Sequence, residues 1–145
     1  MSESEALKAV VWRFLDEIWH QGNLQVIDEV IAPNYVRHTS HYREGGREVQ
    51  GPEGARQSIA AFRGAFPDVH FTVEDMLVAD EKVVVRWTCR GTHRGAFLGV
   101  APTGKGVTFT GINIYRIANN QIVERWAAED GISLYQQLGL LAPRS

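Results

Sequence analysis

The chain has 145 residues, of which 44% are hydrophobic and 22% charged, and its formal net charge is −2. This length fits one domain over residues 1–145, and 15 basic against 17 acidic residues give no basic surface for nucleic-acid binding. The single cysteine, Cys89, excludes disulfide frameworks and multi-cysteine metal sites. Without a secretory signal or a membrane-length apolar run, the sequence predicts a soluble, cytoplasmic protein with no membrane partner.

The first predicted element is an amphipathic helix. Apolar residues recur every three or four positions over residues 7–19, which places them on one stripe of a helix. Ser2 and Glu5 have the spacing of a capping box at its start. Gly22 is placed to end this helix.

Two further helices are expected before the chain changes its pattern. Asn23 is predicted to cap a short helix over residues 24–31, which Pro33 ends. A third helix is predicted over residues 51–66, with Pro52 at a first-turn position.

The second half of the chain predicts strands, because apolar and β-branched residues alternate with a period of two. A change of parity near Glu74 and Asp75 suggests a β-bulge in the first of them. Asn119 and Asn120 form a two-residue hairpin signal. The predicted strands are 69–78, 82–93, 107–117 and 121–130, followed by a helix over 133–138.

Helices followed by a meander of long strands indicate an α+β fold. We expect one strongly curved antiparallel sheet with the helices covering one of its faces.

Side-chain alternation groups the strand residues by face. On the strand 82–93, Trp87 and Cys89 share an apolar face with His93 at its end. On the strand 107–117, one face carries Phe109, Gly111, Asn113 and Tyr115, and the other Ile112, Ile114 and Arg116. The sequence leaves open which of these two faces looks inward.

Asp130 shares a face with Trp126 at the end of the last predicted strand. It has two interpretations. Asp130 caps the final helix from just before Gly131, or it is a pocket carboxylate whose desolvation suits it to proton transfer. The two roles are compatible with one another.

Two motif matches carry little weight. Residues 99–105 match a phosphate-binding loop, but Gly106 replaces the hydroxyl residue and a strand follows instead of a helix. His38 and His41 have the spacing of a metal pair without a convincing third ligand, so no metal site is predicted.

Several short segments, in this order and spacing, resemble the SnoaL-like polyketide cyclase family over most of the chain. They are Phe66-Pro67-Asp68, Gly91-Thr92-His93-Arg94-Gly95, Phe97-Leu98-Gly99, Pro102-Thr103-Gly104-Lys105, Phe109-Thr110-Gly111-Ile112, Ile122-Val123-Glu124-Arg125-Trp126 with Asp130, and Gln137-Leu138-Gly139.

The resemblance implies a nuclear transport factor 2-like fold, a cone-shaped α+β barrel around a deep apolar pocket. It also implies ring closure by intramolecular aldol condensation without metal or cofactor, with an aspartate at the end of a late strand as acid/base. Asp130 occupies that place. Members of the family also use a histidine on the preceding strand. Here that strand has none, and Asn113, Tyr115 or Arg116 are the possible substitutes.

The resulting hypothesis is an enzyme for a small hydrophobic or polyketide-like ligand, with no cofactor. Asp130 would act as base and then acid. His93, Asn113 and Tyr115 are the candidates for polarising a carbonyl, and the predicted substrate-binding residues are His38, Trp87, Phe109 and Trp126.

Alternatives on the same fold are a ketosteroid isomerase-like enzyme, an epoxide hydrolase-like enzyme, or a non-catalytic small-molecule binding module. The epoxide hydrolase would need an Asp-Arg-Asp group, of which Asp68, Arg86 and Arg116 offer parts. A homodimer or higher homo-oligomer is also expected, with Ile112 and Ile114 supplying the contact if they face outward.

Overall fold

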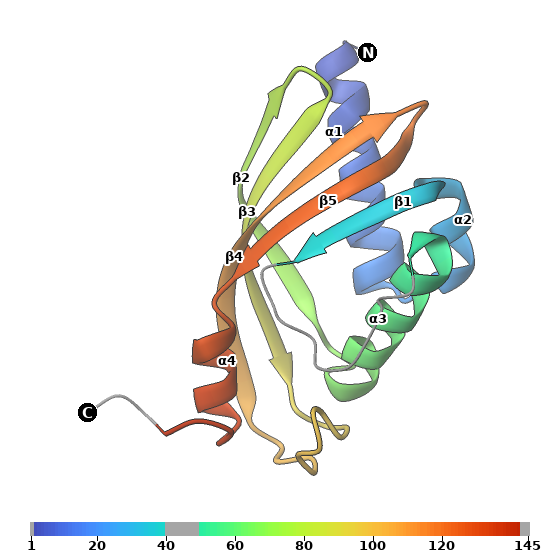
Figure 1. Cartoon of the computed structure of the whole chain (residues 1–145). Coiled ribbons are helices and arrows are strands. Elements are labelled where there is room, and N and C mark those ends of the chain that lie inside the picture. Colours follow the sequence, from blue (N-terminus) through green and yellow to red (C-terminus); the bar gives the residue numbers. More distant parts are fainter. Residues whose placement is uncertain (1, 40–49, 143–145) are drawn as a thin grey trace.

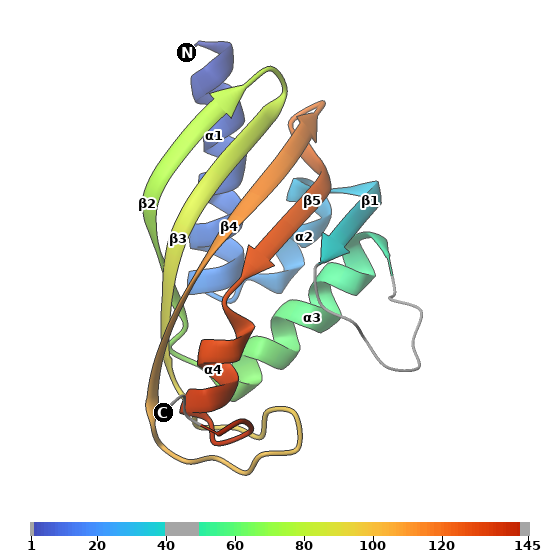
Figure 2. The ribbon, with the colours of Figure 1, turned by 60° about the vertical axis from the view of Figure 1, so that its left-hand side comes forward.

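The computed structural model describes residues 2–39 and 50–142, and it is built on one curved sheet in the order β1-β5-β4-β3-β2. Helices α1, α2 and α3 lie on one face of this sheet, and α4 lies beside the lower end of β4 (Figures 1 and 2). The elements are α1 (Glu3–Arg13), the π-helical η1 (Phe14–His20), the 3-10 turn η2 (Leu24–Val26), α2 (Ile27–Val30), β1 (Ile31–Thr39), α3 (Gly51–Ala65), β2 (His70–Ala79), β3 (Lys82–Thr92), β4 (Gly106–Ala118), β5 (Gln121–Glu129) and α4 (Gly131–Gln137).

The predicted α+β class is confirmed, but the sheet is open at β1 and β2 and is not wholly antiparallel. Strands β2 to β5 form an antiparallel meander, whereas β1 pairs parallel with β5. The prediction of an all-antiparallel sheet is therefore wrong at this edge. Strand β1 comes from the first half of the chain and reaches β5 through α3 and the meander, so no short hairpin constrains its direction.

The first helix follows its prediction closely. The Ser2 hydroxyl accepts the backbone N–H of Glu5 at 3.1 Å, and the Glu5 carboxylate accepts the N–H of Ser2 at 3.4 Å, which confirms the capping box. The helix continues from α1 into η1 without a break, and its apolar stripe packs on the sheet. The buried members of that stripe are Val11, Phe14, Leu15 and Ile18.

The second helix is shorter than predicted. Asn23 makes no side-chain cap, and the first turn of this segment is 3-10 rather than α. The helix ends at Val30, and Ile31 already belongs to β1. Pro33 therefore lies inside a strand instead of stopping a helix. An edge strand tolerates it, since the missing N–H can face away from the ladder.

Local irregularities of the sheet match the sequence signals. The register of β2 against β3 shifts between Val73 and Asp75, where the bulge was predicted. Asn119 and Asn120 both have positive φ, 52° and 59°, as a tight turn joining two strands requires. A second register shift, between Arg116 and Ile117, leaves an extra residue in β5. It was not predicted.

The inner face of the sheet holds the apolar core. On β3 and β4 the predicted grouping by face is confirmed, and the set that contains Trp87, Phe109, Asn113 and Tyr115 is buried. The indole of Trp87 lies directly over Gly111, its register partner on β4. A Cβ added at Gly111 would come within 2.8 Å of three ring atoms of Trp87, so the indole can lie here only because residue 111 has no side chain.

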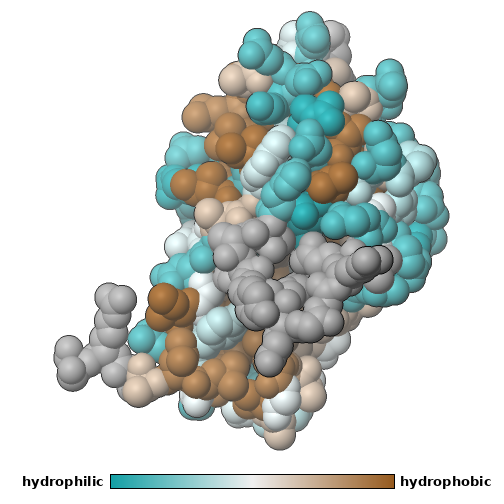
Figure 3. All heavy atoms as spheres, in the orientation of Figure 1, coloured by the Kyte–Doolittle hydropathy of each residue, from teal (hydrophilic) through white to brown (hydrophobic). Residues whose placement is uncertain are grey.

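The outer face is mixed in character. Apolar side chains lie in separate patches among hydrophilic ones on the face shown in Figure 3. Ile112 faces outward and is 47% exposed, and Ile114 lies on the same face of β4. A subunit contact through these residues stays a prediction. None of the described helices is long and apolar enough to cross a membrane.

His20 connects the end of η1 to β2. Its Nε2 accepts the backbone N–H of Phe71 at 3.0 Å, so the proton is on Nδ1, which donates to Asp16 at 3.1 Å. Burial lowers the pKa of His20, the stacked His70 lowers it further, and the Asp16 carboxylate opposes these effects only in part. The folded protein therefore favours the neutral ring.

Acidification should weaken the fold through His20. Because its pKa is lower in the folded than in the unfolded chain, its contribution to stability is complete above about pH 6.5 and is lost as the pH falls towards the folded pKa. Urea unfolding at about pH 7.5 and pH 5.5 measures this loss. The loss should be smaller in His20→Asn than in the wild type, and an equal loss in both proteins would contradict this role.

Gly111→Ala should destabilise the protein by about 1–3 kcal/mol, because Trp87 must leave its place over the strand. Gly106→Ala on the same strand is the matched control, since nothing lies within 4 Å of a Cβ built there. Denaturant titration of both variants measures the difference. Equal stabilities of the two variants would show that Trp87 repacks freely.

Asp130 is the N-cap of α4, and its carboxylate accepts the backbone N–H of Ser133 at 3.0 Å. Asp130→Ala should cost about 1 kcal/mol of stability, and Asp130→Asn much less, because asparagine caps as well as aspartate. Thermal unfolding of the two variants measures these costs. A loss of the same size in both would mean that the negative charge matters and the cap does not.

Candidate active site

Polar side chains gather on the inner face of the sheet where β1, β5 and β4 meet. Arg125 on β5 is the register partner of Tyr115 on β4 and of Arg37 on β1. Strand alternation turns Tyr35, two residues before Arg37, to the same side. Tyr35 and Tyr115 are both buried, so these groups form a polar cluster inside an otherwise apolar wall.

The guanidinium of Arg125 stays charged in this setting. Burial by itself lowers its pKa, but Tyr35, Tyr115 and the Glu129 carboxylate more than offset that effect, and the net pKa is raised. The Nε atom of Arg125 is buried and makes no hydrogen bond within the described part of the chain. A charged donor therefore lies inside the protein with part of its bonding capacity unused.

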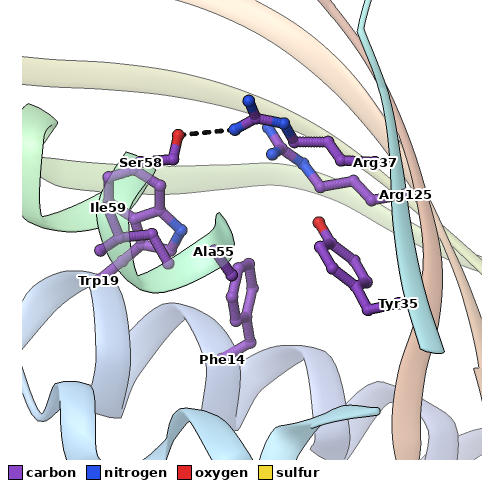
Figure 4. A pocket seen from close by; sticks show the side chains of 8 residues that line it. All are labelled: Phe14, Trp19, Tyr35, Arg37, Ala55, Ser58, Ile59 and Arg125. Carbon is purple, nitrogen blue, oxygen red and sulfur yellow. Dashed lines mark hydrogen bonds between the residues drawn. The ribbon is translucent and has the colours of Figure 1, made fainter. Parts of the chain in front are cut away.

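A small pocket adjoins this cluster (Figure 4). Its volume is about 10 Å³, roughly the room that one water molecule needs. Arg37 donates from its guanidinium to the Ser58 hydroxyl at 2.6 Å across this pocket. The residues that line it are Phe14, Trp19, Tyr35, Arg37, Ala55, Ser58, Ile59 and Arg125.

Asn113 and Tyr115 lie next to the same cluster. Asn113 Nδ2 donates to the Tyr115 hydroxyl at 2.9 Å, and Asn113 Oδ1 is buried and has no partner among the described residues. Burial raises the pKa of Tyr115, so its phenol is neutral at physiological pH and keeps a proton to donate. These two candidates from the sequence are therefore brought together.

Glu129 is a carboxylate of β5 on the inner face. It is half-buried and lies opposite Gly111 in the register of β4 and β5. The pKa of buried Cys89 is raised chiefly by desolvation and further by the charge of Glu129, which also acts on Arg125. The negative charge thus acts on inward side chains of two strands.

Trp87 and Phe109 form the apolar part of this wall. Their rings meet edge to face with centroids 5.5 Å apart. Trp87 Nε1 is a buried donor with no hydrogen-bond partner in the described residues. Both residues, predicted to bind substrate, therefore lie on the inner face with Asn113 and Tyr115.

His93 is fully buried but anchors a loop. The backbone N–H and the hydroxyl of Thr103 both bond to its Nδ1, at 3.2 and 3.0 Å. Its backbone bonds to Gly104 and Lys105. Its ring packs near Phe66, with centroids 5.5 Å apart. Through Nδ1 and its backbone, His93 holds the segment that resembles a phosphate loop, while its buried Nε2 has no hydrogen-bond partner among the described residues.

Three predicted site residues lie elsewhere. Asp130 is exposed, and its carboxylate caps α4. Trp126 and His38 are register partners on the outer face, where their rings stack at 5.1 Å and His38 donates to Glu124 at 2.9 Å. The prediction that Trp126 lines the inner pocket fails, because the bulge in β5 turns Arg125 and Glu129 inward instead.

The parts of an epoxide hydrolase group do not converge. Arg86 bonds to Asp75 and Arg116 to Glu124, both outside the inner face, while Asp68 binds the backbone and hydroxyl of Thr92. The residues described contain no group of three His, Cys, Asp or Glu placed to hold a metal ion. His41, the other half of the predicted histidine pair, lies outside the described residues.

Sequence reasoning missed Arg125, Glu129, Tyr35 and Arg37. The sequence did contain a signal for Arg125 and Glu129, because they alternate on one strand face with the apolar Val123 and Ala127. Charged residues are unusual on a face that points inward. Tyr35 and Arg37 carried no comparable signal, because their strand pairs with a partner distant in the chain.

Comparison with solved structures supports the fold. The chain is 31% identical to a "putative polyketide cyclase" of Acidithiobacillus ferrooxidans, with a TM-score of 0.82 over 98% of this chain and 100% of that one. It is 30% identical to IdmH of Streptomyces antibioticus, described as a "putative polyketide cyclase", with a TM-score of 0.77 over 92% and 98% of the chains.

AclR of Streptomyces galilaeus, described as a "putative hydroxylase", shares the fold alone, with 23% identity and a TM-score of 0.83 over 99% of this chain and 87% of that one. No curated protein matches the sequence. The family model for SnoaL-like polyketide cyclases matches residues 9–138. The chain belongs to the SnoaL-like polyketide cyclase family.

Proposed function

We propose that this protein closes a ring in a polyketide-type substrate by intramolecular aldol condensation, with Glu129 as the group that exchanges the proton. The observation that carries the proposal is an inward carboxylate on β5 beside buried hydrogen-bond donors and acceptors. Membership of the family supports the reaction class.

The chemistry requires a base, a carbonyl-polarising donor and a folded substrate. Glu129 would take a proton from a carbon between two carbonyls, and the resulting enolate would attack a ketone of the same chain to form the new C–C bond. The protonated Glu129 would then return its proton to the new alkoxide. Trp87 Nε1 and the Tyr115 hydroxyl are buried donors suited to a carbonyl oxygen.

Asp130, which the sequence predicted as the base and then the acid, is the second candidate for this role. Its place next to Glu129 at the end of β5 favours it, and its exposure and its bond to Ser133 count against it. An isomerase on the same inner face would use the same carboxylate, but its product would have a shifted double bond and no new ring.

Three carboxylates of one chain segment provide the test. Glu129→Gln should lower turnover about 10²–10⁴-fold, as expected for the loss of a general acid–base group. Asp130→Asn keeps the cap and should remain near wild-type activity, as should Glu124→Gln on the outer face. The assay uses a triketone that can close a six-membered ring. It measures ring closure by mass spectrometry and deuterium uptake at the acidic carbon by NMR.

The outcomes separate the candidates. A loss of both signals in Glu129→Gln alone supports the proposal. A loss in Asp130→Asn with an active Glu129→Gln would return the role to Asp130. Deuterium uptake without ring closure in the wild type would indicate an isomerase, and no catalysis of either step would indicate a binding module.

A further inference from the structure

Three residues of the inner face lie side by side across β3, β4 and β5. Trp87 is the register partner of Gly111, and Gly111 is the register partner of Glu129. Side chains at paired positions of adjacent strands project to the same face of a sheet. The strand between the indole and the proposed base therefore carries no side chain at this level.

The indole of Trp87 extends over this gap. Of its three ring atoms within 2.8 Å of the place of a Cβ at residue 111, one is Cε2, the carbon that bears Nε1. The nitrogen-bearing edge of the ring thus lies over β4, the strand between β3 and β5. Glu129 is only half-buried, so solvent reaches this stretch of the inner face from the end of β5.

Ring contacts hold the indole in this place. Phe71 from β2 and Phe109 from β4 meet it edge to face, with centroids 5.0 and 5.5 Å away and interplanar angles of 85° and 87°. Trp87 is 2% exposed, and its Nε1 has no hydrogen-bond partner among the described residues. A buried donor without an acceptor destabilises the folded state, and a catalytic role is one explanation for keeping it.

We propose that Trp87 Nε1 donates to the carbonyl oxygen next to the carbon that Glu129 deprotonates, and that Gly111 is the positioning residue that keeps the space between them free. This inference rests on the proposed function and deepens it. As the proton passes from carbon to the carboxylate, the electron pair of the C–H bond moves towards that oxygen, and the N–H stabilises the developing charge. Nε1 is covered in the free protein, so the substrate displaces a side chain of this face as it binds.

Tyr115, the other donor named for the reaction, is less suited to this oxygen. It lies four residues beyond Gly111 on β4, about 14 Å along the strand, where its partners in the register are Val83 and Arg125. Its hydroxyl also accepts a hydrogen bond from Asn113. The two donors therefore lie at different levels of the sheet, and only Trp87 shares the level of Glu129.

Deuterium uptake at the acidic carbon of the triketone, measured by NMR, reports proton removal separately from ring closure. Trp87→Phe should lower kcat for uptake about 10²–10³-fold with little change in KM, as expected for loss of one donor that acts in the transition state. Trp12→Phe, which removes an indole from the exposed face of α1, is the matched control and should keep the wild-type kcat. If Trp87→Phe does not fold, benzothienylalanine at position 87 keeps the shape of the indole and removes only its N–H.

A double-mutant cycle tests the role of Gly111, with kcat expressed per folded protein and the folded fraction measured by circular dichroism. Gly111→Ala should lower kcat about 10²-fold, because it moves the donor. In the Trp87→Phe background the same substitution should change kcat by no more than about twofold, because the donor is already absent. Gly106→Ala should leave kcat unchanged.

The structural and positioning roles of Gly111 give different results in this cycle. A merely structural glycine would lower the free energy of unfolding in Gly111→Ala and leave the kcat of the folded protein at the wild-type value. An equal loss of kcat in both backgrounds would show that Gly111 does not act through Trp87. Either result would overturn its positioning role.

Failure of this inference and failure of the proposed reaction are distinguishable. Wild-type kcat in folded Trp87→Phe, together with a loss in Glu129→Gln, would overturn the donor and leave the base in place. A loss in Trp87→Phe with full activity in Glu129→Gln would reject Glu129 as the base and keep Trp87 as the donor.

Discussion

The interior of this molecule depends on how the charge of Arg125 is accommodated. Removal of a guanidinium from water costs several kcal/mol unless partners replace the lost hydration. Here the partners come from three strands: Tyr35 on β1, Tyr115 on β4 and Glu129 on β5 itself. The edge strand, the centre of the sheet and the last strand are thus tied to one another by a single polar group.

The groups around Arg125 also make this part of the inner face of the sheet polar. Apolar faces from α1, η1 and α3 would by themselves form an ordinary core, with Phe14 against Tyr115 and Trp19 against Phe62. Around Arg125 the packing changes into a set of donors and acceptors that are held in place without full use of their bonds. Most buried polar groups in native proteins are hydrogen-bonded, and a catalytic role is one of the explanations for those that are not.

The sequence predicted most of the fold, because the local signals were strong. Alternation grouped the residues of β3 and β4 by face, although it left open which face of β4 looks inward, and the capping box located the start of α1. Strand β1 was harder to foresee, because its parallel partner β5 lies almost ninety positions away, as the His38–Glu124 separation of 86 shows. Local patterns do not carry information about such a pairing.

The residues that lie on the inner face were foreseen only in part. Asn113, Tyr115, Trp87 and Phe109 were selected from the correct face, whereas on β5 the large indole of Trp126 suggested the wrong one. Stacking on His38 and the nearby ammonium of Lys82 satisfy that indole outside the core. The sequence indicated correctly that Trp126 packs against other side chains. Whether it does so on the inner or the outer face is decided by the bulge in β5 and by the pairing of β5 with β4.

The parallel pairing of β1 also has a consequence for synthesis of the chain. Ile31–Thr39 is synthesised well before Gln121–Glu129, its neighbour in the sheet, because α3 and the strands β2 to β4 lie between them in the chain. The backbone of β1 therefore has no β5 to pair with until all the elements between them have also been synthesised. Long-range closure of this kind slows folding, and it makes the junction of β1 and β5 one of the last parts of the molecule to form.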